Sequence, residues 1–256
     1  MKTLLFTLWI TLVISSPLIA QTATEYKPVG GVLQLKNIHL WRGQEVTAEA
    51  TLATDIYYTN KKQNLRLGLW GGAGVNGNFK EIDYYINYNV AGFTFALWDI
   101  YNFSTGATYN NRQAFNYKAR ETGHFVDLSV AYQFPQKLPL RVYWATVLFG
   151  RDRGALNEKN RYSTFVELGY PVLSNKIVDL NVGIGGAFAM SKGKDISGGK
   201  SDAHFYGDSP GIVSINLTLS KTFDIRGYKL PLSITPMWNP EKNYANIQVA
   251  LQLLSL

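Results

Sequence analysis

Hydrophobic and polar residues alternate with a period of two along most of this chain. Between Val213 and Leu219 every second residue is apolar, and the residues between them are Ser214, Asn216 and Thr218. A strand produces this pattern because its successive side chains point to opposite faces of a sheet. The segment is therefore predicted to be a strand with one apolar and one polar face.

Twelve segments of the chain alternate in this way, and we expect each of them to form a strand. All are longer than the average globular strand of about five or six residues. In the first one the parity changes between Leu35 and Ile38, which a β-bulge would explain. The predicted strands are 32–42, 45–58, 64–75, 79–89, 92–102, 123–134, 138–150, 160–170, 176–190, 210–222, 228–238 and 243–254.

Two all-β architectures can accommodate such strands, a soluble sandwich and an antiparallel barrel that spans a membrane. A sheet face in water usually carries many Lys and Glu residues. The polar faces here hold mainly Ser, Thr, Asn, Gln and Gly, as the lumen of a membrane barrel does. Aromatic residues lie near the strand ends, as in an interfacial girdle. We therefore predict a single antiparallel transmembrane β-barrel of about twelve strands.

The lengths of the connections agree with a barrel in a bacterial outer membrane. When the N-terminus lies in the periplasm, connections after odd-numbered strands face outward and are the longer ones. The three long connections, 103–122, 151–159 and 191–209, follow the fifth, seventh and ninth predicted strands. We expect short periplasmic turns, three longer outer loops and a narrow lumen, because twelve strands enclose less space than the sixteen of a large porin.

Composition and charge exclude several other classes. The chain has 256 residues, of which 17% are charged and 14% aromatic, with no cysteine and a net charge of +7. Without cysteine it is neither a disulfide-stapled module nor a zinc ribbon. The basic charge lacks the stripe that nucleic-acid binding requires, so no nucleic acid is expected. Part of it lies in connections that could contact outer-membrane lipid: Lys61, Lys62, Arg151, Arg153, Lys192, Lys194 and Lys200.

The first twenty residues have the features of a secretory signal peptide. Lys2 gives a positive start, an apolar run follows from Leu4 to Ile14, and Ala20 is a small residue suited to cleavage. The apolar run is shorter than the ~20 residues of a transmembrane helix. We expect residues 1–20 to direct export and residues 21–256 to form the barrel, inserted by the barrel-assembly machinery.

Three short motifs occur in order along the first four predicted strands: Trp-Arg-Gly, then Gly-Leu-Trp-Gly, then Glu-Ile-Asp-Tyr with a further Tyr. Their marker residues are Trp41, Arg42, Gly43, Trp70, Gly71, Tyr84 and Tyr88. In this order they resemble the TorF-type porins of Gram-negative outer membranes. Segments 122–127 and 161–165 are similar to uncharacterised exported barrel proteins related to that family. The resemblance implies an outer-membrane barrel with a transport role.

Charged residues on the inward parity are the candidate functional residues. They comprise seven acids and two bases: Glu49, Asp55, Glu81, Asp83, Asp127, Glu167 and Asp179, with Arg66 and Arg141. Such an excess of acids would favour cations in a pore. Alternatively, inward salt bridges could brace or plug the barrel, or a specific ligand could bind there, because a charge in a narrow lumen needs a partner or water.

Neither metal nor catalytic chemistry is indicated by the remaining polar residues. Glu81 and Asp83 point the same way, but no third oxygen ligand lies near them in the sequence, so no metal or cofactor is expected. His124 lacks a serine at the right parity, His39 is expected at the interface, and His204 is expected on the surface. We expect no enzyme.

The sequence thus predicts a narrow porin-like channel for small solutes of unknown identity, with a preference for cations. Two alternatives remain open at this stage. One is a closed structural or binding barrel whose outer loops engage a partner. The other is a soluble periplasmic β-barrel that binds a ligand.

Overall fold

The structure is a computed structural model that describes residues 26–256. The predicted signal peptide, residues 1–20, lies outside the described residues. Residues 26–256 form strands, turns and loops, and no helix among them is long and apolar enough to cross a membrane. Segment 111–121, within the long connection 103–122, is an irregular loop.

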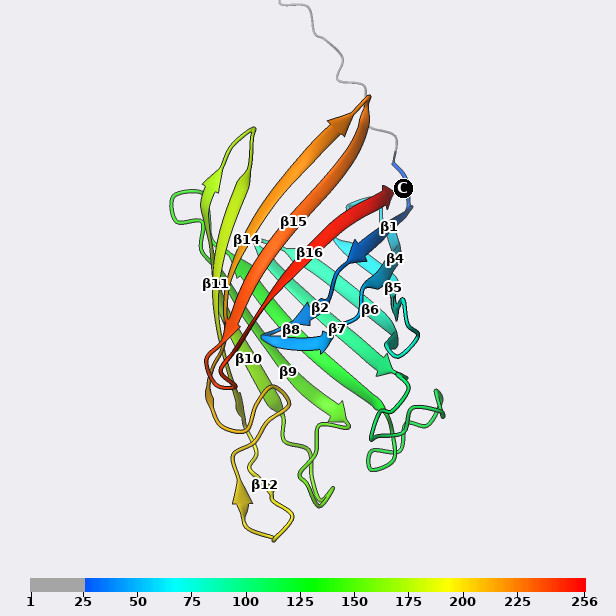
Figure 1. The fold of residues 1–256 in the computed structure, drawn as a ribbon, viewed down its shortest axis with the longest axis vertical. Helices are drawn as coiled ribbons and strands as arrows, with labels where there is room; N and C mark the ends of the chain where they lie inside the picture. Colours follow the sequence, from blue (N-terminus) through cyan, green and yellow to red (C-terminus); the bar gives the residue numbers. More distant parts are fainter. Residues whose placement is uncertain (1–25) are drawn as a thin grey trace, which may run out of the picture.

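Twelve long antiparallel strands form one closed barrel, which confirms the predicted fold class (Figure 1). Each barrel strand pairs with the barrel strands that come before and after it along the chain, and the last strand pairs with the first to close the ring. The barrel strands are β1 (Val29–Lys36), β4 (Thr51–Thr59), β5 (Leu65–Gly74), β6 (Lys80–Val90), β7 (Phe93–Asn102), β8 (His124–Gln133), β9 (Arg141–Gly150), β10 (Ser163–Ser174), β11 (Asp179–Ala189), β14 (Gly211–Ile225), β15 (Tyr228–Asn239) and β16 (Tyr244–Ser255).

The outer face of the barrel is an apolar belt to which every barrel strand contributes. Leu69 on β5, Tyr84 on β6, Trp144 on β9 and Ile215 on β14 are among its exposed side chains. A soluble protein rarely exposes an apolar surface of this extent, because burying such surface is what drives folding in water. The belt is what a transmembrane barrel presents to lipid, and it disfavours the soluble alternative.

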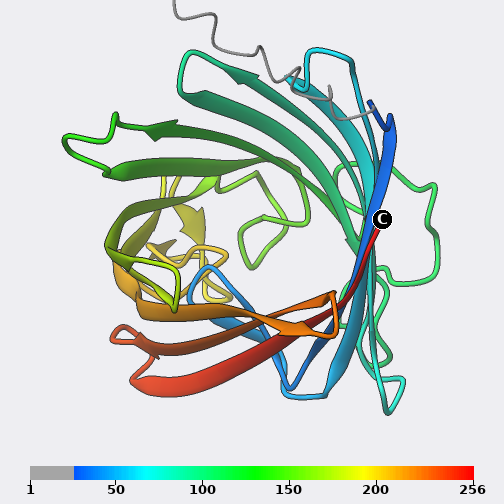
Figure 2. The same ribbon diagram turned by 90° about the horizontal axis from the view of Figure 1, so that it is seen from above.

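Four additional short strands lie outside the barrel ring. β2 (His39–Trp41) pairs with β3 (Gln44–Thr47), and β12 (Gly193–Lys194) pairs with β13 (Lys200–Ser201). The β2–β3 hairpin lies inside the ring (Figure 2), whereas the β12–β13 hairpin extends beyond one end of the barrel (Figure 1).

The hairpin corrects the first two predicted strands. Segments 32–42 and 45–58 were each expected to be one barrel strand. Instead the wall strand β1 ends at Lys36 and β4 begins at Thr51, and residues 37–50 between them turn into the lumen. The change of parity after Leu35 marks this departure from the wall and is not a bulge within one strand.

Four of the six connections at one end of the barrel are long, and those at the other end are short. We call these the loop end and the turn end. The long connections are 37–50, 103–123, 151–162 and 190–210. The three that the sequence predicted do lie together at the loop end. The fourth, 37–50, was missed because its two short strands continue the alternation of the wall strands.

Candidate functional site

The β2–β3 hairpin covers part of the lumen. Near its base, the backbone N–H of Leu40 donates to Gln248 Oε1 at 2.9 Å, which holds the hairpin to the inner face of β16. Its tip contacts Asp127 on β8 and Tyr143 on β9. In the ring order these two strands lie on the side away from β1 and β4, where the hairpin originates. The hairpin therefore crosses the lumen (Figure 2).

The tip of the hairpin is a two-residue turn formed by Arg42 and Gly43. Trp41 and Gln44 pair across it, and the turn residues have φ values of 46° and 80°. Two positive φ values are the signature of a type I′ turn, whose twist matches that of the flanking strands. The Trp-Arg-Gly motif is thus the tip of an inward hairpin, not the end of a wall strand.

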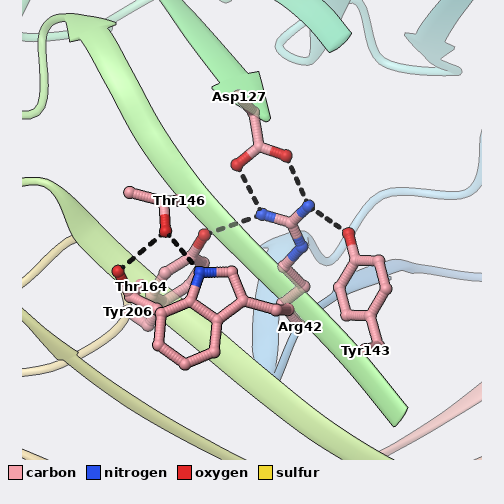
Figure 3. A network of polar contacts seen from close by, with 7 residues as sticks. Arg42, Asp127, Tyr143, Thr146, Thr164 and Tyr206 are labelled. Atoms are coloured by element: carbon pink, nitrogen blue, oxygen red, sulfur yellow. Dashed lines mark hydrogen bonds and ion pairs between the residues drawn. The ribbon is translucent and has the colours of Figure 1, made fainter. Parts of the chain in front are cut away.

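Arg42 attaches the tip to the far wall. Its guanidinium donates two parallel hydrogen bonds to Asp127, at 2.8 and 2.6 Å, and another at 2.8 Å to the hydroxyl of Tyr206 (Figure 3). A further bond reaches the hydroxyl of Tyr143. The guanidinium also lies over the Trp41 ring, 4.5 Å from its centroid. This bidentate geometry is the strong form of an Arg–carboxylate pair.

The position of Gly43 requires a glycine for two reasons. Its φ is positive, and a Cβ atom there would lie 2.1 Å from the carbonyl oxygen of Val213 on β14. The Gly43 carbonyl accepts hydrogen bonds from Asn239 Nδ2 at 2.9 Å and from the Tyr244 hydroxyl at 2.7 Å. The close approach to β14 therefore depends on the missing side chain.

Aromatic side chains pack around the hairpin tip. Phe205 and Tyr206, from the 190–210 connection, enter the lumen. Trp41 packs against both and against Phe125, with ring centroids 5.6–6.1 Å apart, and Phe125 and Phe205 lie 4.8 Å from each other. Tyr206 is fully buried. The hairpin and part of this connection therefore occupy much of the loop-end half of the lumen.

A cavity of about 980 Å³ remains between the hairpin and the inner face of β5 to β7. Its wall on that side consists of Trp70, Glu81, Asp83, Trp98, Ile100 and Asn102. The hairpin, the end of β1 and the neighbouring connections supply the other side. Its main charged and aromatic lining residues there are Lys36, His39, Trp41, Arg42, Glu45, Tyr109, Arg151, Phe205 and Lys242.

Three of the predicted lumen charges meet at this cavity. Glu81, Asp83 and Asp127 all line it, and Asp83 and Asp127 are almost fully buried. Two bases that face these acids, Arg42 and Arg151, are absent from the predicted lumen charges. Arg42 falls at the end of the predicted strand 32–42, on the parity of the apolar residues Ile38 and Leu40, and Arg151 falls in a predicted connection. The excess of acids in the lumen is consequently smaller than the predicted seven against two.

Other predicted charges line the lumen away from the cavity. Asp55 accepts hydrogen bonds of 2.9 and 3.0 Å from the hydroxyl of Tyr85, and Arg66 lies 3.8 Å from the centroid of the Tyr57 ring. Part of this turn-end region, around Tyr57 and Arg66, is a second cavity of about 370 Å³.

The remaining predicted charges divide between the barrel wall and the rim. Arg141 and Glu167 face each other at 4.0 Å, as the bracing hypothesis expects. Asp179 accepts a hydrogen bond from Ser174 Oγ at the turn end. The prediction that Glu49 lies on a barrel strand was wrong. It lies on the connection between β3 and β4 and accepts a hydrogen bond from Asn78 Nδ2 at the rim.

The residues of the family motifs have different surroundings. Trp70 faces the lumen and stacks on His39 at 5.4 Å between ring centroids. Tyr84 and Tyr88 point outward into the apolar belt, and Gly71 shares their face because it pairs with Ile82, which is also exposed. These outward residues contribute to the lipid surface and not to the lumen.

Two histidines were wrongly placed by the sequence. His39 is 8% exposed and lies inside the barrel, and His204 is 5% exposed within the 190–210 connection. His204 Nε2 lies 2.9 Å from the Ser209 carbonyl, and its Nδ1 lies 3.2 Å from the Tyr206 backbone nitrogen. Burial lowers the pKa of His204, partly offset by the bond to Ser209. The neutral ring thus positions Tyr206.

Comparisons with known proteins identify similar barrels but no family. No protein-family model matches the chain, and no curated protein matches it either. The resemblance to TorF-type porins therefore stays a prediction.

Among solved structures, the chain is similar to an outer membrane channel from Pseudomonas putida F1, with a TM-score of 0.45, 14% identity, and coverage of 88% of this chain and 93% of that one. A bacterial polysaccharide outer membrane secretin gives a TM-score of 0.36 at 8% identity, covering 88% and 95%. CdiB from Escherichia coli gives 0.35 at 8% identity, covering 92% of this chain and 64% of CdiB. Likenesses at this level do not identify what this chain transports or binds.

Proposed function

We propose that this protein is an outer-membrane channel for small solutes, constricted by its β2–β3 hairpin. The observation that carries the proposal is the hairpin's path across the lumen beside a cavity of about 980 Å³. A lumen without an inserted segment would be a wide opening, and a fully packed one would leave no such space. A constricted channel requires both the inserted segment and the remaining space.

Residence in the outer membrane is part of the proposal. The apolar belt covers all twelve strands, and closed barrels with short turns at one end and long loops at the other are typical of bacterial outer membranes. The loop end would then face the cell exterior. The proposed activity is passive passage, which needs no catalytic residue, cofactor or metal.

A modest preference for cations completes the proposal. Asp127 is neutralised by Arg42, so the unpaired acids of the cavity wall are Glu81 and Asp83. Lys36 and Arg151 lie close enough to Glu81 to oppose its charge. We therefore expect a weaker preference than seven acids and two bases would give.

The closed barrel remains a second candidate because of one observation. Arg42 fastens the hairpin to Asp127 and Tyr206, and aromatic residues pack around it in the same half of the lumen. If that contact does not open, the long connections at the loop end would be the functional surface.

Reversal potentials in a planar bilayer under a salt gradient test the channel proposal. The wild-type protein should conduct with a cation-selective potential, and the double variant Glu81→Gln, Asp83→Asn should move that potential toward zero. Asp179→Asn is the matched control, because that acid lies at the turn end beside Ser174. An unchanged potential in the double variant would remove the assigned role of Glu81 and Asp83, and absence of current in folded wild-type protein would favour the closed barrel.

A further inference from the structure

Asp83 is a buried carboxylate that lacks a basic partner. Its side chain is 4% exposed, and no hydrogen-bond donor within residues 26–256 reaches its Oδ1 atom. Across the same residues it forms no ion pair. The charged side chains that act on it, Glu81 and Asp99, are both acids. A buried charge normally has a partner, because removing it from water is costly.

Glu81, two residues away, has different surroundings. Its Oε2 accepts a hydrogen bond of 3.0 Å from Asn102 Nδ2, and Lys36 and Arg151 oppose its charge. Bases therefore oppose the charge of Glu81, whereas none pairs with Asp83.

Two tryptophans flank Asp83 on the cavity wall. Trp70 on β5 pairs directly with Asp83. On β7 the residue that pairs with Asp83 is Ile100, and Trp98 lies two residues before it on the same face, diagonal to Asp83. Trp98 stacks on Tyr85 at 4.2 Å, which holds its ring in place. All these side chains except Tyr85 line the cavity. Aromatic faces attract cations and also pack against apolar groups.

We infer that this cavity binds a small organic cation, with an ammonium or guanidinium group at Asp83 and an apolar body against Trp70 and Trp98. An anion placed at Asp83 would be repelled by its carboxylate and by that of Glu81. A metal ion would need several oxygen ligands, and residues 26–256 contain no cluster of three or more such groups that could hold one. The volume of about 980 Å³ is at the upper end of ordinary ligand pockets. The inference deepens the proposed channel by naming the class of solute.

Binding in detergent micelles tests the inference without any need for conductance. Tryptophan fluorescence of the refolded protein is titrated with benzylammonium chloride, and in parallel with benzyl alcohol, which has a similar shape and no charge. Benzylammonium should give a saturable change with at least about tenfold higher affinity than benzyl alcohol, because a hydrogen bond to a charged group is worth that much. Equal affinity of the two probes, or no saturation, would overturn the inference.

Variants then locate the site. Asp83→Asn should weaken benzylammonium binding about tenfold or more, and Trp70→Leu should weaken it without changing the charge. Asp179→Asn, which changes an inward acid outside the cavity, should bind as the wild type does. Folding of each variant is checked by heat-modifiable migration on a gel. Should Asp83→Asn fail to fold, the affinity of Trp70→Leu for benzylammonium tests the site in its place. Wild-type affinity in a folded Asp83→Asn or Trp70→Leu protein would contradict the site.

Binding and conductance measurements test the cation site and the channel separately. Binding by a protein that passes no current would keep this site and remove the proposed channel. Current without charge-selective binding would keep the channel and remove the site.

Discussion

Arg42 has both a backbone role and a side-chain role, and the two support each other. Its positive φ of 46° forms one half of the hairpin turn, and its guanidinium pairs with Asp127, whose side chain is 1% exposed. The sequence displayed Arg42 only as part of a short motif. Its partner could not be inferred, because 85 residues separate the two and only the closed ring brings them together.

Breaking the Arg42–Asp127 pair should destabilise the protein. Arg42→Gln leaves the buried Asp127 carboxylate without its compensating charge, and such losses cost about 3–5 kcal/mol. Urea unfolding in detergent, followed by tryptophan fluorescence, measures the change. The double variant Arg42→Gln, Asp127→Asn should recover part of the loss. Losses that simply add in the double variant would show that the pair is not coupled.

Gly43 and Gly77 offer a matched comparison of two glycines with similar backbones. Their φ values are 80° and 78°, but a Cβ atom at Gly43 would collide with Val213, whereas one at Gly77 would meet nothing within 4 Å. Gly77→Ala should cost only about 1 kcal/mol of backbone strain. Gly43→Ala should cost clearly more in urea unfolding, because the hairpin must also move away from β14. Equal losses would contradict the close contact.

At the scale of elements, the wall strands were predictable and the inserted hairpin was not. Alternation over ten or so residues identified β5 to β11 closely, because a wall strand has one lipid face and one lumen face. The strands β2 and β3 alternate as well, since each also has two different faces. Alternation shows that successive side chains face two different environments, but it does not show which environments these are. Only the change of parity after Leu35 and the glycine at position 43 indicated a separate element.

The 190–210 connection should respond to acid through His204. Its pKa is lower in the folded protein than in the unfolded chain, where it is about 6.5, so the unfolded chain binds more protons. The stabilisation is present above that value and is lost as the pH falls below it, when Nδ1 can no longer accept the Tyr206 N–H. Unfolding in urea at pH 7.5 and about pH 5 should show this loss in wild type, and a smaller one in His204→Gln. The same acid loss in both proteins would exclude His204 as its source.

At the scale of the whole molecule, the closed barrel and its apolar belt follow from the sequence, but the contents of the lumen do not. The parity of Glu81, Asp83 and Asp127 correctly indicated an inward direction. Of the opposing bases, Arg151 lies on a connection, where no periodicity tells which way a side chain points. Arg42 lies at the tip of a hairpin whose alternation resembles that of a wall strand. Charge balance in the lumen is therefore a tertiary property, and a count along the strands overestimated its negative charge.

Removal of the hairpin is possible without disturbing the wall. Lys36 and Thr51, the residues at its two ends, pair directly between β1 and β4. An Asn-Gly turn can therefore replace residues 37–50 and join the two strands as an ordinary hairpin. A matched control shortens the β12–β13 hairpin, by replacing residues 195–199 with the same turn, because that hairpin extends away from the barrel (Figure 1).

Single-channel current of these two variants and the wild type is the most direct test of a channel constricted by its own hairpin. The wild type and the β12–β13 control should show the same small current steps, and the protein without residues 37–50 should show clearly larger ones. Equal steps in all three proteins would contradict the constriction. Current only in the protein without residues 37–50 would show that the hairpin closes the barrel.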